Sequence, residues 1–396
     1  MVMRHFPFSN NARLFSVSLD IAMNTLHRPP LWLLTLLIMF PQLVETIYSP
    51  ALPGIATSYH VSSERAAQTL SVYFVAFAVG VAMWGWLSDC IGRRRAMMAG
   101  LLCYATGSLM AVVATDFSVL LLARMVSAIG AAAGSVVVQT MLRDSYESTA
   151  LSRVFSVMGA ALALSPVFGL LSGGWLVSLY GHTGVFVALV LLALLLLMLT
   201  ITMLPETRPE HTLRPRLAAL LSRMARDYEL WKNAMLVALL NTMLFSYYSL
   251  APFLFGQLGW SSRAFGLTGL LLAFASLSGS LLNQRLLTTG LTPEQLVRYA
   301  CALAALSGLV AWCLQHSAWI LIPVFGVVIA YGIAIPNVLS QALRHYREQA
   351  GAAGALFGLS YYLLLGMMLG FAGMVQQLGL VLSVCALLAW LCSLGR

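Results

Sequence analysis

Two ionisable residues lie alone within long apolar segments of this chain. Glu45 is the only acidic residue deep inside such a segment. A charge in hydrocarbon is costly, so its carboxylate needs a partner, water or a proton. Protonation is the least costly of these, which makes Glu45 a candidate proton carrier. The alternative is a carboxylate beside a wet outer vestibule that only forms a structural pair.

Arg124 is the only basic residue well inside an apolar segment, at a depth comparable with that of Glu45. A fixed cation stabilises a nearby carboxylate, and protonation of that carboxylate then changes the electric field around it. The two residues together therefore predict a proton-transfer site. The alternative is a structural guanidinium that donates hydrogen bonds to backbone carbonyls.

The segments that must position these residues are membrane spans. Of the 396 residues 60% are hydrophobic and only 9% are charged, against about 25% charged in soluble domains. The sequence therefore predicts an integral membrane protein. Twelve apolar segments are long enough to be spans: 31–52, 66–88, 96–114, 119–141, 153–176, 184–204, 233–255, 264–284, 298–315, 319–342, 353–376 and 379–395.

The basic residues predict which side each loop faces. The outward loops contain only Arg65 and Arg263, and apart from Arg124 the other Lys and Arg residues fall in inward segments. The positive-inside rule then places both termini in the cytoplasm. Because the arginines punctuate apolar segments, the net charge of +9 does not indicate a nucleic-acid partner.

We expect a chain of two halves. Residues 1–30 form a cytoplasmic segment without a signal-peptide pattern, in which Met23 would be a natural start. A six-helix bundle over 31–204 is followed by a cytoplasmic linker, 205–232, with six basic residues, and by a second six-helix bundle, 233–396. The two halves also resemble each other weakly, because the segment Gly279–Asn283 follows span eight in the same way that Gly85–Asp89 follows span two. Such parallel halves hold a site between them near the membrane midplane.

A short charged loop joins spans two and three. It contains Gly85, Asp89, Gly92, Arg93 and Arg94. Gly85 suits a close approach of two helix ends, and Gly92 permits a turn with positive φ. Asp89 can cap a helix or pair with an arginine, and the arginines hold the loop on the cytoplasmic side.

Arg143 and Asp144, at the inner end of span four, are expected partners of this loop. Such a charge network would latch the inner helix ends and break when the site opens inward. The alternative is that these are solvated loop charges.

Span five carries a stripe of small residues and a proline: Ala161, Ser165, Pro166, Gly169 and Gly173. Small residues at every fourth position let another helix approach closely, and the proline can kink the span. Generic helix packing is the alternative explanation of this stripe.

Three of these patterns together resemble the major facilitator superfamily. The loop at Gly85–Arg95 is similar to that family's loop between helices two and three, Leu120 to Ala133 is similar to its span-four pattern, and the span-five stripe is similar to its antiporter motif. The resemblance implies an all-α membrane fold of twelve helices in two halves. It implies the drug:proton antiporter branch, near chloramphenicol, bicyclomycin and EmrD-like exporters, with Glu45 and Arg124 in proton coupling. Glu45 comes one position earlier than the acid of those relatives, which turns its side chain about 100° around the helix.

Aromatic and amide residues in the spans expected to line a cavity are candidates for substrate contact: Tyr48, Tyr73, Phe74, Phe77, Asn241, Phe245, Tyr248, Tyr331, Asn337, Tyr361 and Tyr362. Aromatic walls with few polar groups suit flat, lipophilic, variable ligands. The alternative is that individual aromatics face lipid or other helices.

These observations predict a monomeric exporter of the bacterial inner membrane that exchanges protons for an amphipathic small molecule. They predict neither an enzyme nor a metal or cofactor site, and the absence of a Walker A sequence excludes ATP as the energy source. The alternatives are an exporter of one metabolite, such as a sugar or nucleoside, and a membrane sensor or assembly factor that binds a partner at 205–232.

Overall fold

The computed structural model describes residues 29–146, 148–209 and 217–395, and these form helices without any strand. The expectations for residues 1–28 lie outside the described residues. The helices in chain order are α2 (Leu31–Tyr48), η1 (Ser49–Ala51), α3 (Leu52–Ser58), α4 (Ser63–Ile91), α5 (Arg93–Val112), α6 (Phe117–Ser145), α7 (Ser148–Met203), α8 (Leu217–Ala225), α9 (Tyr228–Gln257), α10 (Ser262–Thr288), α11 (Pro293–Cys313), η2 (Ala318–Ile320), α12 (Leu321–Ala342), η3 (Arg344–Gln349), α13 (Ala350–Val375) and α14 (Leu378–Leu394).

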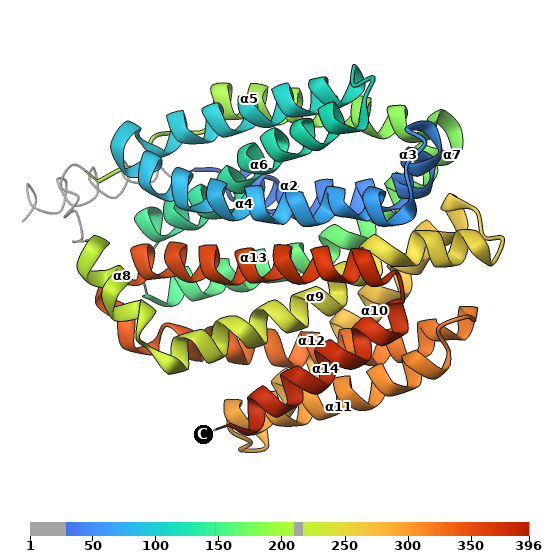
Figure 1. Ribbon diagram of the computed structural model, residues 1–396. Coiled ribbons are helices and arrows are strands. Elements are labelled where there is room, and N and C mark those ends of the chain that lie inside the picture. The colour runs from blue at the N-terminus through green and yellow to red at the C-terminus, as the bar shows by residue number, and fades with distance from the viewer. Residues whose placement is uncertain (1–28, 147, 210–216, 396) are drawn as a thin grey trace, which may run out of the picture.

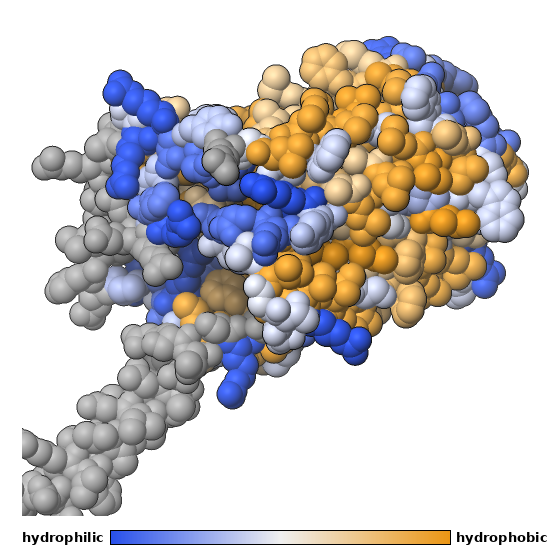
Figure 2. Space-filling view, turned by 90° about the horizontal axis from the view of Figure 1, so that it is seen from below, coloured by the Kyte–Doolittle hydropathy of each residue, from blue (hydrophilic) through white to orange (hydrophobic). Residues whose placement is uncertain are grey.

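Ten of the described helices are long and apolar enough to cross a membrane. One of them, α7, contains two predicted spans and is broken at Gly181, where φ is 65°. The last predicted span is α14, which has 17 residues. Each of the twelve predicted spans therefore corresponds to a helix or to one part of α7. Figure 2 shows apolar residues across the middle of one face, with hydrophilic residues gathered mainly towards its two ends.

Side-chain caps explain where several helices begin. Ser62, Ser261 and Thr292 each accept a hydrogen bond from a backbone N–H of the first turn of α4, α10 and α11, and Asp227 does so for α9. Such caps satisfy N–H groups that have no partner inside the helix. Because the caps lie beyond the apolar segments, α4 and α9 begin before the spans predicted at 66 and 233.

The helices pack side by side with nearly parallel axes, in two groups (Figure 1). The N-terminal group holds α2 to α7 and the C-terminal group holds α9 to α14, and they meet where α4 contacts α13 and α7 contacts α10. We call the end of the bundle with α8 the α8 end, and the opposite end the α3 end. Helix α8 lies within the predicted linker 205–232.

The two groups are in close contact towards the α3 end. There the Ser49 hydroxyl donates a hydrogen bond of 2.5 Å to the carbonyl oxygen of Tyr248. Gly174 of α7 lies against the backbone of α10, since a Cβ atom on Gly174 would lie 2.6 Å from the Ser262 oxygen and 3.1 Å from Gly266 Cα. Small residues permit this approach of two backbones.

The charged loop predicted at residues 85–95 is much shorter than expected, and this part of the prediction was wrong. Helix α4 continues to Ile91 and α5 begins at Arg93, so Gly92 alone connects them. Its φ of 98° reverses the chain within one residue, as expected for glycine. Gly85 lies within α4, where a Cβ atom would be in ordinary contact with Ala355 at 3.5 Å. Gly85 is therefore not required by a close helix approach.

Candidate functional site

Glu45 and Arg124 are both buried and lie near each other between α2 and α6. Their exposed fractions are 4% and 2%. The Glu45 carboxylate is within electrostatic range of Arg124, but makes no direct ion pair or hydrogen bond within the described residues. A buried carboxyl group and a buried guanidinium therefore lie near each other without a direct bond, and the uptake or loss of a proton by Glu45 changes the attraction between them.

The Arg124 guanidinium is held by aromatic rings. Its Cζ atom lies 4.0 Å from the ring centroid of Tyr48 and 4.3 Å from that of Tyr73. Cation–π contact of this kind stabilises the charge by about 2 kcal/mol when it is desolvated. Nε and Nη2 of Arg124 are buried and have no hydrogen-bond partner, and neither do the hydroxyls of Tyr48 and Tyr73. The site therefore contains several donors for which the described residues supply no acceptor.

The small-residue stripe of span five lies directly beside Glu45. A Cβ atom at Gly169 would overlap Thr46 and lie 3.0 Å from the nitrogen of Ile47, and one at Gly173 would overlap the Ile47 carbonyl. The hydroxyl of Ser165 is buried and donates to the carbonyl of Ala161 at 3.1 Å. The stripe thus lets Thr46 and Ile47, which follow Glu45, pack closely against α7. Pro166 lies within the same helix.

Glu45 also faces the C-terminal half. The tyrosines within electrostatic range of its carboxylate come from α4, α5, α9, α12 and α13: Tyr73, Tyr104, Tyr248, Tyr331, Tyr361 and Tyr362. Since these helices belong to both groups, Glu45 lies near the junction of the two halves.

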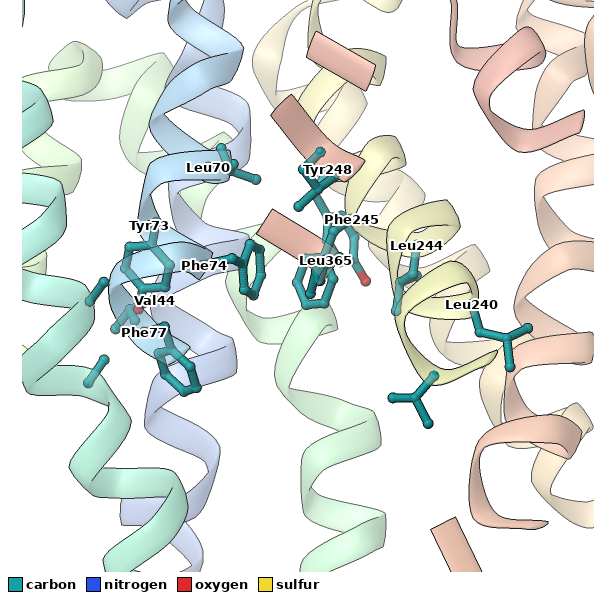
Figure 3. Packing of buried hydrophobic residues seen from close by; sticks show 14 of the residues in the cluster. Val44, Leu70, Tyr73, Phe74, Phe77, Leu240, Leu244, Phe245, Tyr248 and Leu365 are labelled. Carbon is teal, nitrogen blue, oxygen red and sulfur yellow. The ribbon is translucent and has the colours of Figure 1, made fainter. Parts of the chain in front are cut away.

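A cluster of aromatic rings fills that junction. Phe74 of α4 packs edge-on against Phe245 of α9, with ring centroids 4.4 Å apart, and Phe77 packs against Tyr362 of α13 at 4.8 Å. Figure 3 shows Phe74 pointing from α4 towards Phe245 and Leu365, with Tyr73 and Phe77 on the side of Phe74 away from Phe245. Tyr361 packs against Tyr362 with the ring centroids 4.3 Å apart and the ring planes tilted by 39°. Aromatic residues that are far apart in the sequence therefore contact one another across the two halves.

The amide candidates form two separate pairs. Asn241 Oδ1 accepts a hydrogen bond from the Tyr331 hydroxyl at 3.1 Å. Asn337 is buried and donates to Asn283 Oδ1 at 2.6 Å, inside the C-terminal half between α12 and α10. The Asn241 pair lies beside the tyrosines that face Glu45, whereas the Asn337 pair joins two helices of one half.

The charged network at the α8 end is centred on Arg93. Its side chain is 3% exposed, and it pairs with Asp89 at 2.6 Å and with Asp144 at 2.9 Å. Its guanidinium also donates to the Ser88 carbonyl at 2.9 Å. Arg93 therefore joins α4, α5 and α6, while Arg143 is exposed.

Glu206, which we did not single out in the sequence, completes this network. Its carboxylate accepts hydrogen bonds from the backbone N–H groups of Arg93 at 2.8 Å and Arg94 at 3.2 Å. Those groups begin α5, so Glu206 caps that helix from the end of α7 and complements its dipole. The signal available in the sequence was an acid directly after Pro205 at the end of a span.

Comparison with known proteins decides the family. The family model described as Major Facilitator Superfamily matches residues 31–384. The chain belongs to the major facilitator superfamily. An uncharacterized transporter of Rickettsia bellii is 30% identical over 87% of this chain and 89% of its own length. Multidrug resistance protein D of Escherichia coli is 26% identical over 91% of this chain and 94% of its own length.

Among solved structures, a D-xylose-proton symporter superposes with a TM-score of 0.72 at 15% identity, over 91% of this chain and 96% of that one. At this identity the likeness shows the fold alone. The predicted all-α fold of the major facilitator class is confirmed. This chain is a multi-pass membrane transporter and not an enzyme, and its relatives include members of the drug-exporting branch that the motifs indicated.

Proposed function

We propose that this major facilitator protein exports amphipathic small molecules in exchange for protons. It works as a monomer in the bacterial inner membrane, with the α8 end and both termini in the cytoplasm. The observation that carries this proposal is the placement of Glu45 beside Arg124 at the junction of the two halves. A buried carboxylate near a buried cation, both within reach of tyrosines from each half, can couple a proton to the relative position of the halves.

The proton and Arg124 compete for the Glu45 carboxylate. When Glu45 is ionised, it is the natural acceptor for Nε and Nη2 of Arg124, which lack a partner in the present arrangement. When Glu45 takes up a proton it becomes neutral and loses most of its attraction to Arg124. Each protonation would thus release α2 from α6, and because Gly169 packs on Thr46, α7 would move with α2.

The aromatic cluster is the proposed substrate site. Tyr73, Phe77, Phe245, Tyr248 and Tyr362 are mostly buried against one another in this arrangement. Separation of the halves would expose their faces to a ligand. Ring faces favour flat lipophilic molecules and fix few hydrogen bonds, which suits a broad range of compounds.

The network around Arg93 is proposed to act as a latch within one half, because all of its members lie in the N-terminal group, and to stay closed instead of breaking as the site opens. Asp89, Asp144 and Arg93 hold the α8 ends of three helices of one half, so that this half moves as a body. A rigid half is what alternating access requires, because the site must be exposed to one side at a time.

An exporter of one defined metabolite is the second candidate. The hydrogen-bonded pair of Asn241 and Tyr331 favours it, because fixed polar groups beside the aromatic cluster can recognise a hydroxyl-bearing ligand such as a sugar or nucleoside. A multidrug site would depend on the rings and tolerate loss of this pair.

Transport in proteoliposomes tests both candidates. We expect an imposed pH gradient to drive several unrelated lipophilic compounds, with chloramphenicol as a first neutral probe, and Asn241→Ala to leave that transport within about twofold. If only one hydroxyl-rich compound moves and Asn241→Ala abolishes it, the second candidate holds. If correctly inserted protein shows no proton-dependent flux of any compound, proton-coupled export is refuted for both candidates.

A further inference from the structure

A basic pocket lies at the α8 end, away from the Glu45 site. It has a volume of about 490 Å³, and its walls include Arg94, Arg95, Met98, Glu206 and Arg208. Three guanidinium groups against one carboxylate give the pocket an excess of positive charge. Its size is sufficient for a phosphate group with a short polar attachment.

The arginines of this pocket are available to a ligand. Arg95 is exposed, and its side chain makes no hydrogen bond or ion pair within the described residues. Nε of Arg94 is buried without a partner, although Nη2 of the same residue donates to the Ile201 carbonyl at 2.6 Å. Arg208 uses one nitrogen, Nη1, on the Cys90 carbonyl at 2.9 Å. An acceptor with several oxygen atoms would satisfy these donors.

The carboxylate in the pocket offsets only one of the three positive charges. Glu206 already accepts four backbone N–H groups, from Arg93, Arg94, Thr207 and Arg208. The bonds from Arg93 and Arg94 hold it against the start of α5. Its oxygen atoms are therefore occupied by the backbone and do not pair with the guanidinium groups.

The surface next to the pocket is apolar and lies along the spans. Met98 lines the pocket, and Leu102, one turn further along α5, is 57% exposed. Beside them on α7, Ile201 and Met203 are 45% and 43% exposed. A ligand held by its phosphate in the pocket would thus have an apolar track for its tail along α5 and α7.

We propose that this pocket binds the phosphate headgroup of an anionic phospholipid of the cytoplasmic leaflet. The orientation rests on the proposed topology, whereas the binding itself does not depend on transport. Basic pockets between helices on the cytoplasmic side suit such headgroups, and each arginine near an anionic surface contributes about 1 kcal/mol. A soluble phosphate compound shares the headgroup chemistry but would not use the apolar track.

Native mass spectrometry of the purified full-length protein tests the proposal. It is titrated with phosphatidylglycerol, phosphatidylcholine or inorganic phosphate. We expect tighter binding of phosphatidylglycerol than of phosphatidylcholine, and about fivefold weaker phosphatidylglycerol binding in Arg95→Gln, as about 1 kcal/mol implies. Arg208→Gln should weaken phosphatidylglycerol binding by a similar factor. The matched control is Arg285→Gln, an exposed arginine at the α8 end of α10 whose side chain has no partner within the described residues.

Thermal unfolding in the same lipids shows that each variant is folded. Phosphatidylglycerol should raise the unfolding midpoint of the wild type and of Arg285→Gln more than that of Arg95→Gln. An equal loss of phosphatidylglycerol binding in Arg285→Gln would overturn the proposal, because any surface arginine would then be enough to bind the lipid. Equal binding of both lipids would also overturn it. If inorganic phosphate binds as tightly as phosphatidylglycerol, the pocket takes a soluble ligand and the lipid assignment is wrong.

Discussion

Replacement of Glu45 by glutamine should abolish the coupling of transport to protons. The variant keeps the shape of the side chain and fixes its neutral form. Because the carboxylate makes no direct hydrogen bond or ion pair within the described residues, we expect the variant to fold and insert normally. A neutral substrate should still bind to it, since the aromatic cluster is unchanged.

The expected accumulation of substrate follows from the number of buried acidic residues. Among the described residues Glu45 is the only buried acidic residue, so one side chain carries one proton in each cycle. A gradient of one pH unit supplies about 1.4 kcal/mol for each proton, which supports about tenfold accumulation of a neutral substrate. The wild type should approach this ratio, and Glu45→Gln should reach a ratio of about one.

The assay is steady-state accumulation in proteoliposomes with the membrane potential clamped. A protonophore should collapse the wild-type gradient to the level of the Glu45→Gln variant. Glu64→Gln is the matched control, because Glu64 is an exposed acid in the first turn of α4 and its neutralisation should leave accumulation unchanged. A pH-driven gradient of several fold in Glu45→Gln, at matched protein density, would refute the role of Glu45 and direct attention to Asp89 or Asp144.

Three further substitutions test the rest of the site. Asp89→Asn should leave substrate binding in detergent intact, since it lies at the α8 end, but should lower turnover at least tenfold; near-normal export at equal expression would exclude the latch. Arg124→Lys should lower both the unfolding midpoint and coupled transport, because an ammonium group replaces a planar guanidinium held by two rings; wild-type accumulation ratios would contradict this. Gly169→Val should destabilise the protein by about 1–3 kcal/mol through overlap with Thr46, whereas Gly159→Val, where a Cβ atom meets nothing within 4 Å, should change the unfolding midpoint little.

Some contacts could be predicted from residue type and position alone. A lone charge in an apolar segment is costly, so Glu45 and Arg124 stood out, and the structure places them within electrostatic range. Gly92 was predicted to adopt positive φ because the chain had to reverse between two spans, and it does so. These predictions needed only local sequence and the physics of the bilayer.

Other features depend on residues that are distant in the sequence. Glu206 is more than a hundred positions from the start of α5, and no local pattern indicates that its carboxylate caps that helix. The same cap stabilises the start of α5 at Arg93, directly after the turn. The predicted loop was too long for this reason and because α4 continues to Ile91. The pairing of Asn337 with Asn283 was equally hidden, because a hydrophobicity pattern does not indicate which polar side chains of two spans meet.

That amide pair makes the two related halves unequal in their response to the surrounding solution. Asn283 lies in α10 at the position that corresponds to Asp89 in α4, and it contacts a neutral amide where Asp89 contacts a guanidinium. An ion pair is lost when its carboxylate takes up a proton, whereas a pair of neutral amides has no carboxylate to protonate. The rigidity of the N-terminal half should therefore depend on the pH at the α8 end of the bundle, while the C-terminal half remains a constant reference against which it moves.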